Sequence, residues 1–206
     1  MKKAIMFFIA VLMAATLSSC MNGIEQVESG INSVISQKVA GNFEPGKVDG
    51  DIYINEYMNI KMGLPKGYYF LSEDEIKDVF GVSELYEEGG LVAYDAFMRN
   101  DEGASANVVY QLSAVSAEAY LDMIVGEFTL GNVGGKLELC EKSSVKIGGN
   151  DIPCVNIEIT QEDYEGDNFT MYETIVVKEK EGWIGVITVG SINSGDIDKV
   201  ISKIEF

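Results

Sequence analysis

Short segments of alternating apolar and polar residues, joined by tight turns, constrain the fold of this chain more than any other feature. Residues 155–159 read Val-Asn-Ile-Glu-Ile, which places three apolar side chains on one face of a strand. Residues 169–177 and 183–189 have a similar character, and the turn 180–182 joins them. Because consecutive strands joined by tight turns pair antiparallel, the pattern predicts an antiparallel sheet.

The first half of the chain repeats this pattern. We expect strands within residues 52–64, a turn at Pro65-Lys66-Gly67, and a strand at residues 91–98 that returns over 106–112. Ser72 and Glu75 form a capping box that opens a short helix ending at Gly81.

Two further helices are predicted. Apolar residues between Ala117 and Phe128 recur at helical spacing, after a capping Ser116. Ser194 is expected to cap a terminal helix that carries an apolar face through Ile204. Strands grouped with helices predict an α+β fold, an antiparallel β-sheet sandwiched by helices.

The first twenty residues have the pattern of a bacterial export signal. Lys2 and Lys3 precede a twelve-residue uncharged run, which is too short to span a bilayer. The run ends in Leu17-Ser18-Ser19-Cys20, which resembles a lipobox and implies lipid attachment at Cys20 and cleavage before it. One acyl chain binds a membrane only weakly, so stable anchoring needs more than one chain. Lipoproteins of this type carry a diacylglyceryl group, which supplies two.

We therefore divide the chain into a signal peptide over 1–19, a lipidated cysteine and tether over 20–50, and one domain over 51–206. Within the tether, residues 24–39 carry apolar side chains at helical spacing, yet Gly30 interrupts them. A short amphipathic helix and a flexible spacer both fit this segment.

Several motifs resemble those of small bacterial lipoproteins with a PsbP-like fold. The resemblance rests on residues 55–76, 94–111 and 116–124, and on the Gly-Trp-Ile-Gly-Val-Ile-Thr run at 182–188. It implies an antiparallel sheet sandwiched by helices over roughly residues 51–206. Tyr68 stands where that family often has a tryptophan. Most members have no known activity, so the resemblance implies no catalytic residue.

The composition argues against several functions. The net charge is −18, and Arg99 is the single arginine, so no basic surface is predicted for nucleic acid. The chain contains no histidine, which excludes Ser-His-Asp and Cys-His catalysis and imidazole metal ligands. We expect no catalytic residue, no metal site and no cofactor.

Two cysteines remain after Cys20 is assigned to the lipid. With Gly149-Asn150 as a hairpin turn, Cys154 faces Val145 and Cys140 faces Ile159. The two thiols are then too far apart for a disulfide, which favours two buried free thiols.

Three other features invite a functional interpretation. Acidic residues at 163, 165 and 167, within the stretch 161–168, have the oxygen chemistry of a calcium site, although a solvated loop fits them better. Asp95 and Arg99 lie four apart on a predicted strand, where an ion pair or two separate surface charges are expected. A group of aromatic residues fits a ligand groove or, more often, a core: Tyr53, Tyr57, Tyr68, Tyr69, Tyr86, Tyr94 and Trp183.

The sequence thus predicts an extracytoplasmic lipoprotein, lipid-anchored to the cell membrane. We expect a non-catalytic module that binds a protein or small ligand or assists envelope assembly. The alternative is a receptor for a cation or small ligand that uses the acidic loop 161–168.

Overall fold

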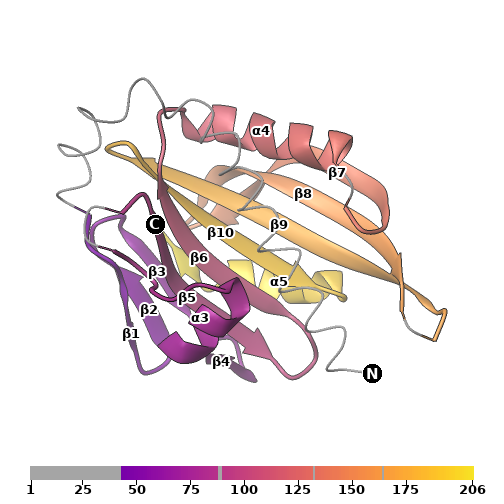
Figure 1. Ribbon diagram of the computed structural model, residues 1–206, viewed down its shortest axis with the longest axis horizontal. Coiled ribbons are helices and arrows are strands. Elements are labelled where there is room, and N and C mark those ends of the chain that lie inside the picture. The colour runs from indigo at the N-terminus through magenta and orange to yellow at the C-terminus, as the bar shows by residue number, and fades with distance from the viewer. Residues whose placement is uncertain (1–42, 88–89, 132, 164) are drawn as a thin grey trace.

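The computed structural model describes residues 43–87, 90–131, 133–163 and 165–206. Two antiparallel sheets form the body of the molecule (Figure 1). The smaller sheet has the order β1 (Lys47–Asp49), β2 (Ile52–Asn55), β3 (Ile60–Gly63) and β11 (Ile204–Glu205). The larger sheet has the order β4 (Tyr68–Phe70), β5 (Val92–Asn100), β6 (Ser105–Leu112), β10 (Trp183–Ser191), β9 (Asn168–Lys180), β8 (Asn150–Glu162) and β7 (Lys136–Ile147).

Three described helices cover the larger sheet. They are α3 (Glu73–Phe80), α4 (Ala117–Leu130) and α5 (Ser194–Ile201). Side chains alternate between the faces of a strand, so Val176 of β9 packs with α5 and the smaller sheet, whereas Ile175 and Val177 pack with α4. Helix α3 packs on Phe97 of β5. The larger sheet therefore lies between a layer of sheet and helix on one face and helices on the other.

The predicted helices begin and end close to the expected residues. Ser72 and Glu75 form both hydrogen bonds of a capping box at α3, and Gly81 ends that helix in the left-handed conformation. Ser116 caps α4 as predicted. The terminal helix differs slightly, because Asn193 rather than Ser194 supplies the capping side chain. The described residues contain no helix with the length and apolarity needed to cross a membrane.

The smaller sheet is an addition to the single sheet that the sequence predicts. Its strands are short, and β1 lies within residues 20–50, the range expected to be a tether. Phe43, also within that range, is 5% exposed and packs in the main core. Residues from Phe43 onward therefore belong to the folded domain, although the sequence assigns residues 43–50 to the tether. The predicted helix over 24–39 and the signal over 1–19 lie outside the described residues.

The β7–β8 hairpin differs in register from the prediction. Ile147 pairs with Asn150, so Gly148 and Gly149 form the turn in place of Gly149 and Asn150. Both glycines have positive φ, 57° and 86°, as a type I′ turn requires. The preference of glycine for this backbone conformation moves the turn by one residue.

Candidate functional site

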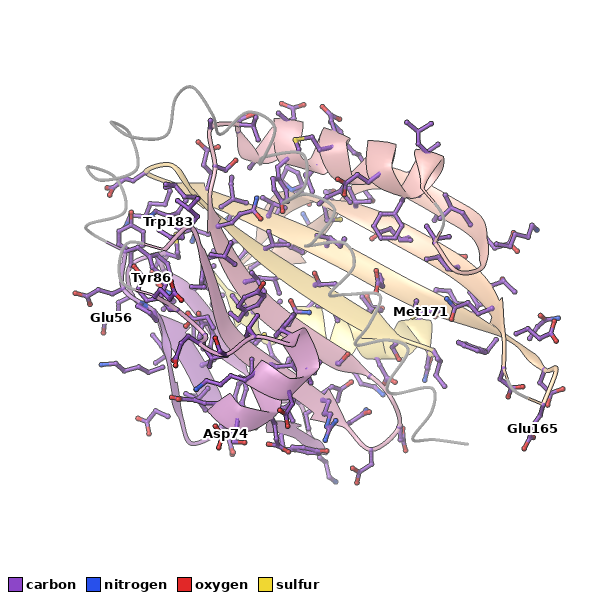
Figure 2. The ribbon with its side chains drawn as sticks, viewed as in Figure 1. Glu56, Asp74, Tyr86, Glu165, Met171 and Trp183 are labelled. Atoms are coloured by element: carbon purple, nitrogen blue, oxygen red, sulfur yellow. The ribbon has the colours of Figure 1, made fainter. Side chains whose placement is uncertain are left out.

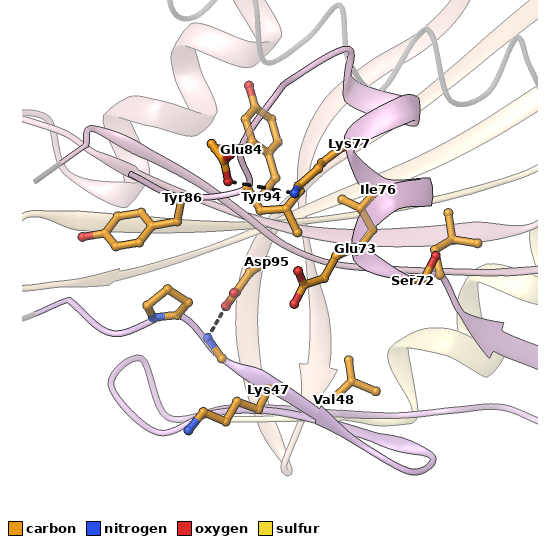
Figure 3. A pocket seen from close by; sticks show the side chains of 14 residues that line it. Lys47, Val48, Ser72, Glu73, Ile76, Lys77, Glu84, Tyr86, Tyr94 and Asp95 are labelled. Carbon is orange, nitrogen blue, oxygen red and sulfur yellow. Dashed lines mark hydrogen bonds and ion pairs between the residues drawn. The ribbon is translucent and has the colours of Figure 1, made fainter. Parts of the chain in front are cut away.

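A cavity of about 650 Å³ lies between β1, α3 and β5 (Figure 3). Four segments line it: Pro45–Val48, the start of α3 with the two residues before it, the loop 84–86, and Tyr94–Asp95 on β5. Ligand cavities in proteins typically measure roughly 300–1,000 Å³. The volume is therefore sufficient for a small organic ligand or for a few residues of a peptide.

Asp95 supplies a carboxylate to this cavity because β5 contains a β-bulge. The pairing of β5 with β6 shifts between Tyr94 and Ala96, so Asp95 is the extra residue. A bulge re-aims a side chain, and Asp95 here turns from the α3 face of β5 toward the smaller sheet.

Three donors hold one oxygen of Asp95. Its Oδ2 accepts hydrogen bonds from the Gly46 backbone N–H at 2.6 Å, the Tyr53 hydroxyl at 2.5 Å and the Asn55 Nδ2 at 3.2 Å. Its Oδ1 carries no hydrogen bond within the described part of the chain. The carboxylate is thus fixed in position while one oxygen remains available to a ligand.

Gly46 can approach Asp95 only because it lacks a side chain. A Cβ atom at this position would lie 2.5 Å from the Tyr53 ring and 2.7 Å from the Ile54 carbonyl oxygen. Asn55 completes the local network, since its Nδ2 also donates to the Glu44 carbonyl and its Oδ1 accepts from the Met58 N–H. The segment before β1 is therefore held directly against the floor of the cavity.

Burial shifts the ionisation of this network. It raises the pKa of Asp95 above its ordinary value, while the hydrogen bonds from Tyr53, Gly46 and Asn55 act in the opposite direction. Burial also raises the pKa of Tyr53, and that of Tyr110, whose hydroxyl lies 2.8 Å from the Tyr53 hydroxyl. Both phenols stay protonated at neutral pH, which keeps Tyr53 as a donor to Asp95.

Helix α3 forms the opposite wall. Ser72 and Glu73 stand at its first turn, and Figure 3 shows Glu73 and Asp95 on facing sides of the cavity. Lys77 lies one turn further along, 3.9 Å from the Glu84 carboxylate. A capping box closes the amino end of α3: the Glu75 N–H donates to the Ser72 hydroxyl oxygen, and the Glu75 carboxylate accepts from the Ser72 N–H and hydroxyl, which lowers the pKa of Glu75.

The aromatic residues singled out from the sequence divide between core and cavity. Tyr53 and Trp183 are fully buried, and Tyr68 is nearly so. Tyr86 and Tyr94 line the cavity, while Tyr57 packs edge-on against Phe43 and Tyr69 is exposed. Only two of the seven therefore contribute to the lining.

Phe43 joins the cavity wall to the core. Its ring stacks on Trp183 with centroids 4.2 Å apart and also contacts Tyr86 edge-on at 5.5 Å. The chain then continues through Pro45 and Gly46 along the cavity. These contacts are absent from the sequence prediction, which assigns the segment to a tether.

An ion pair between Asp95 and Arg99 does not form. Regular alternation would place the two side chains on one face, but the bulge at Asp95 reverses the alternation between them. Asp95 bonds to Tyr53, whereas the Arg99 Nε donates to the Tyr69 hydroxyl at 2.9 Å.

The acidic loop of residues 161–168 lies far from the cavity. Glu165 sits at the tip of the β8–β9 hairpin, at the opposite end of the molecule from Tyr86 and Trp183 (Figure 2). The Asp163 Oδ1 accepts hydrogen bonds from the backbone N–H groups of Glu165 and Asp167, as in an Asx turn. Across the described residues no three acids, cysteines or histidines gather into a group suited to a metal ion.

Cys140 and Cys154 are free thiols, as favoured from the sequence, but only Cys154 is buried and Cys140 is half-buried. The corrected register pairs Cys154 with Ser143 and Cys140 with Ile157, in place of Val145 and Ile159. The two cysteines also contribute to cores on opposite faces of the sheet. Cys20, the predicted site of lipid attachment, lies outside the described residues.

No protein-family model matches this chain, and no curated protein does. The similar solved structures include LpqN, involved in cell envelope biogenesis of Mycobacterium tuberculosis, with 13% identity and a TM-score of 0.44 over 71% of this chain and 82% of LpqN. A Bacteroides thetaiotaomicron structure has 13% identity and a TM-score of 0.38, over 71% of this chain and 44% of the other.

A third similar structure is the cyanobacterial PsbP of Synechocystis sp. PCC 6803. It has 10% identity and a TM-score of 0.42, over 78% of this chain and 97% of that protein. Such identities and TM-scores support no transfer of ligand or activity. A PsbP protein is among the solved structures that this chain resembles.

Proposed function

We propose that this chain is an extracytoplasmic lipoprotein, held at the cell membrane by a lipid on Cys20. Its folded part acts as a non-catalytic module that binds a ligand in the cavity between β1, α3 and β5. The cavity carries this proposal, because it combines a volume of about 650 Å³ with a fixed carboxylate that has one oxygen to spare. The export signal and the lipobox-like Leu17–Cys20 support the location.

The way Asp95 is held supports ligand binding. Three donors fix one carboxylate oxygen, and two of them, Tyr53 and Asn55, are themselves buried. A group fixed before the ligand arrives loses little conformational entropy when the ligand binds.

Anchoring can be tested with Cys20→Ala and, as a matched control, Cys140→Ala, each expressed as the full chain. We expect the parent protein and Cys140→Ala to sediment with membranes and to incorporate an alkyne-labelled palmitate. Cys20→Ala should incorporate no label and should leave the membrane fraction or fail to be processed. Labelling and membrane retention of Cys20→Ala at the parent level would refute the anchoring.

Binding can be tested by blocking the cavity. Val48 lines it and is 44% exposed, so Val48→Trp adds bulk at little cost to the fold. Ligand-observed NMR with a fragment set on the full chain in detergent should find compounds that bind the parent protein and lose at least tenfold in affinity in Val48→Trp. Ile54→Trp, at a similarly exposed position on β2 outside the cavity, serves as the control. Fragments that bind Val48→Trp as tightly as they bind the parent and Ile54→Trp would refute the site.

A further inference from the structure

We propose that the cavity selects a ligand that carries a cationic amine, amidine or guanidinium group on an apolar skeleton. This rests on the proposed function, since it names the ligand class of the same cavity. The features that carry it are the carboxylates of Glu73 and Asp95, which lie on facing walls, and the apolar side chains that line the same cavity.

The charges around the cavity leave these two acids available. Its lining contains five charged side chains: Lys47, Glu73, Lys77, Glu84 and Asp95. Lys77 and Glu84 form a pair with each other, and Lys47 extends away from Asp95 (Figure 3). Neither lysine therefore pairs with the largely buried carboxylate of Asp95 or with the exposed carboxylate of Glu73 at the rim.

Asp95 is the stronger of the two binding groups. Its Oδ2 already accepts three hydrogen bonds, so the bound ligand must donate to Oδ1. A hydrogen bond between a cationic N–H and a carboxylate is about twice as strong as one between neutral groups. In this half-buried position the attraction is also less screened than on an open surface. The same carboxylate repels an anionic ligand.

Apolar side chains favour an organic cation over a metal ion. Leu71, Ile76 and Leu85 line the cavity together with the Tyr86 ring. A calcium ion takes six to eight oxygen ligands, more than Glu73 and Asp95 supply. An amine on a carbon skeleton uses the carboxylates at one end and buries its carbons against the apolar lining at the other.

Benzamidine, benzamide and benzoate form a suitable set of probes, because they share a ring and size and differ in charge. On the full chain in detergent, we expect benzamidine to bind at least tenfold more tightly than benzamide, with no measurable binding of benzoate. Calcium chloride at 1 mM should not displace benzamidine. Equal binding of benzamidine and benzamide, or displacement by calcium, would overturn the inference.

Variants assign the charge preference to the two acids. Asp95→Asn should weaken the binding of benzamidine at least tenfold and should change the affinity for benzamide by less than twofold. Because Asp95 also bonds to the smaller sheet, Glu73→Gln is a second variant that does not disturb the fold, and it should weaken benzamidine three- to tenfold. Asp74→Asn is the matched control, since Asp74 is exposed on the same helical turn outside the lining (Figure 2).

The two proposals fail in different ways. If neutral or anionic fragments bind and Val48→Trp abolishes their binding, the cavity is a binding site and the cationic preference is wrong. If Glu73→Gln and Asp74→Asn weaken benzamidine equally, the effect is one of net charge and the assignment to the cavity is wrong. If no fragment of any charge responds to Val48→Trp, the proposed function itself is wrong.

Discussion

Asp95 lies inside the molecule because a single extra residue in β5 turns its side chain toward the smaller sheet. Alternation along the strand predicts the opposite, with Asp95 and Arg99 on one face. The stretch Ala93–Ala96 carries no local signal for a bulge, and its position depends on pairing with β6. The central residue of the candidate site could therefore be noticed in the sequence but not placed.

The Tyr53 hydroxyl links Asp95 to Tyr110 and contributes to the stability of the fold. Tyr53→Phe removes one donor to Asp95 and leaves the Tyr110 hydroxyl without this partner. Loss of a buried hydrogen bond costs about 1–3 kcal/mol. We expect a loss of that size in the unfolding free energy measured by urea denaturation. Tyr69→Phe, at an exposed position, should change it by less than about 1 kcal/mol.

Glu173 makes stability depend on pH. It is 2% exposed on β9, and its two carboxylate oxygens have no hydrogen-bond partner within the described chain. Burial raises the pKa of Glu173 from 4.5 to about 7. The folded protein therefore holds its proton more tightly than the unfolded chain does. The unfolding free energy is highest below pH 4.5, the pKa in the unfolded chain, and falls as the pH rises to about 7, the pKa in the folded protein.

Glu173→Gln should remove this loss. Each unit of pKa difference corresponds to about 1.4 kcal/mol. As the pH rises from 4.5 to 8, the unfolding free energy of the variant should therefore increase by about 3 kcal/mol relative to that of the parent. Urea denaturation at several pH values measures the difference. Glu165→Gln, at the exposed tip of the β8–β9 hairpin, should follow the parent at every pH. Parallel pH profiles for Glu173→Gln and the parent would contradict the assignment.

At the scale of elements, segments with strong periodicity could be predicted and short edge elements could not. Helix α4 and the β9–β10 hairpin match their sequence patterns. Strand β1 has three residues with one apolar side chain, and β11 has two residues, so neither carries a recognisable period. These short strands complete the smaller sheet, and β1 forms one wall of the candidate site. Local patterns could not locate that site because tertiary contacts assemble it.

Two glycines of the described elements should respond in opposite directions to alanine. A Cβ at Gly126, inside α4, would meet no atom within 4 Å, and alanine favours helix by about 1 kcal/mol. Gly149, in the β7–β8 turn, has a φ of 86°, which strains any other residue. We expect Gly126→Ala to raise the melting temperature and Gly149→Ala to lower it, as measured by circular dichroism. A lower melting temperature for Gly126→Ala would indicate a packing role for that glycine.

At the scale of the whole molecule, the net charge of −18 sets the response to salt. Like charges on a compact chain repel one another, and salt screens them over about 10 Å at 0.1 M and about 3 Å at 1 M. The melting temperature should therefore rise by several degrees between 0.05 and 0.5 M NaCl. KCl should give the same shift, because screening does not distinguish the cation. A fall in the melting temperature would show that attractive ion pairs dominate instead.

The place where the chain enters the domain also determines how the molecule would respond to force. If the lipid proposed at Cys20 anchors the chain, a pull on the domain reaches Phe43, the first described residue, before it reaches β1. The stack of Phe43 on Trp183 and the Gly46 hydrogen bond to Asp95 carry that load ahead of the larger sheet. Tension would thus separate one wall of the cavity from its floor while the long strands stay paired. The candidate site would then open before the larger sheet does.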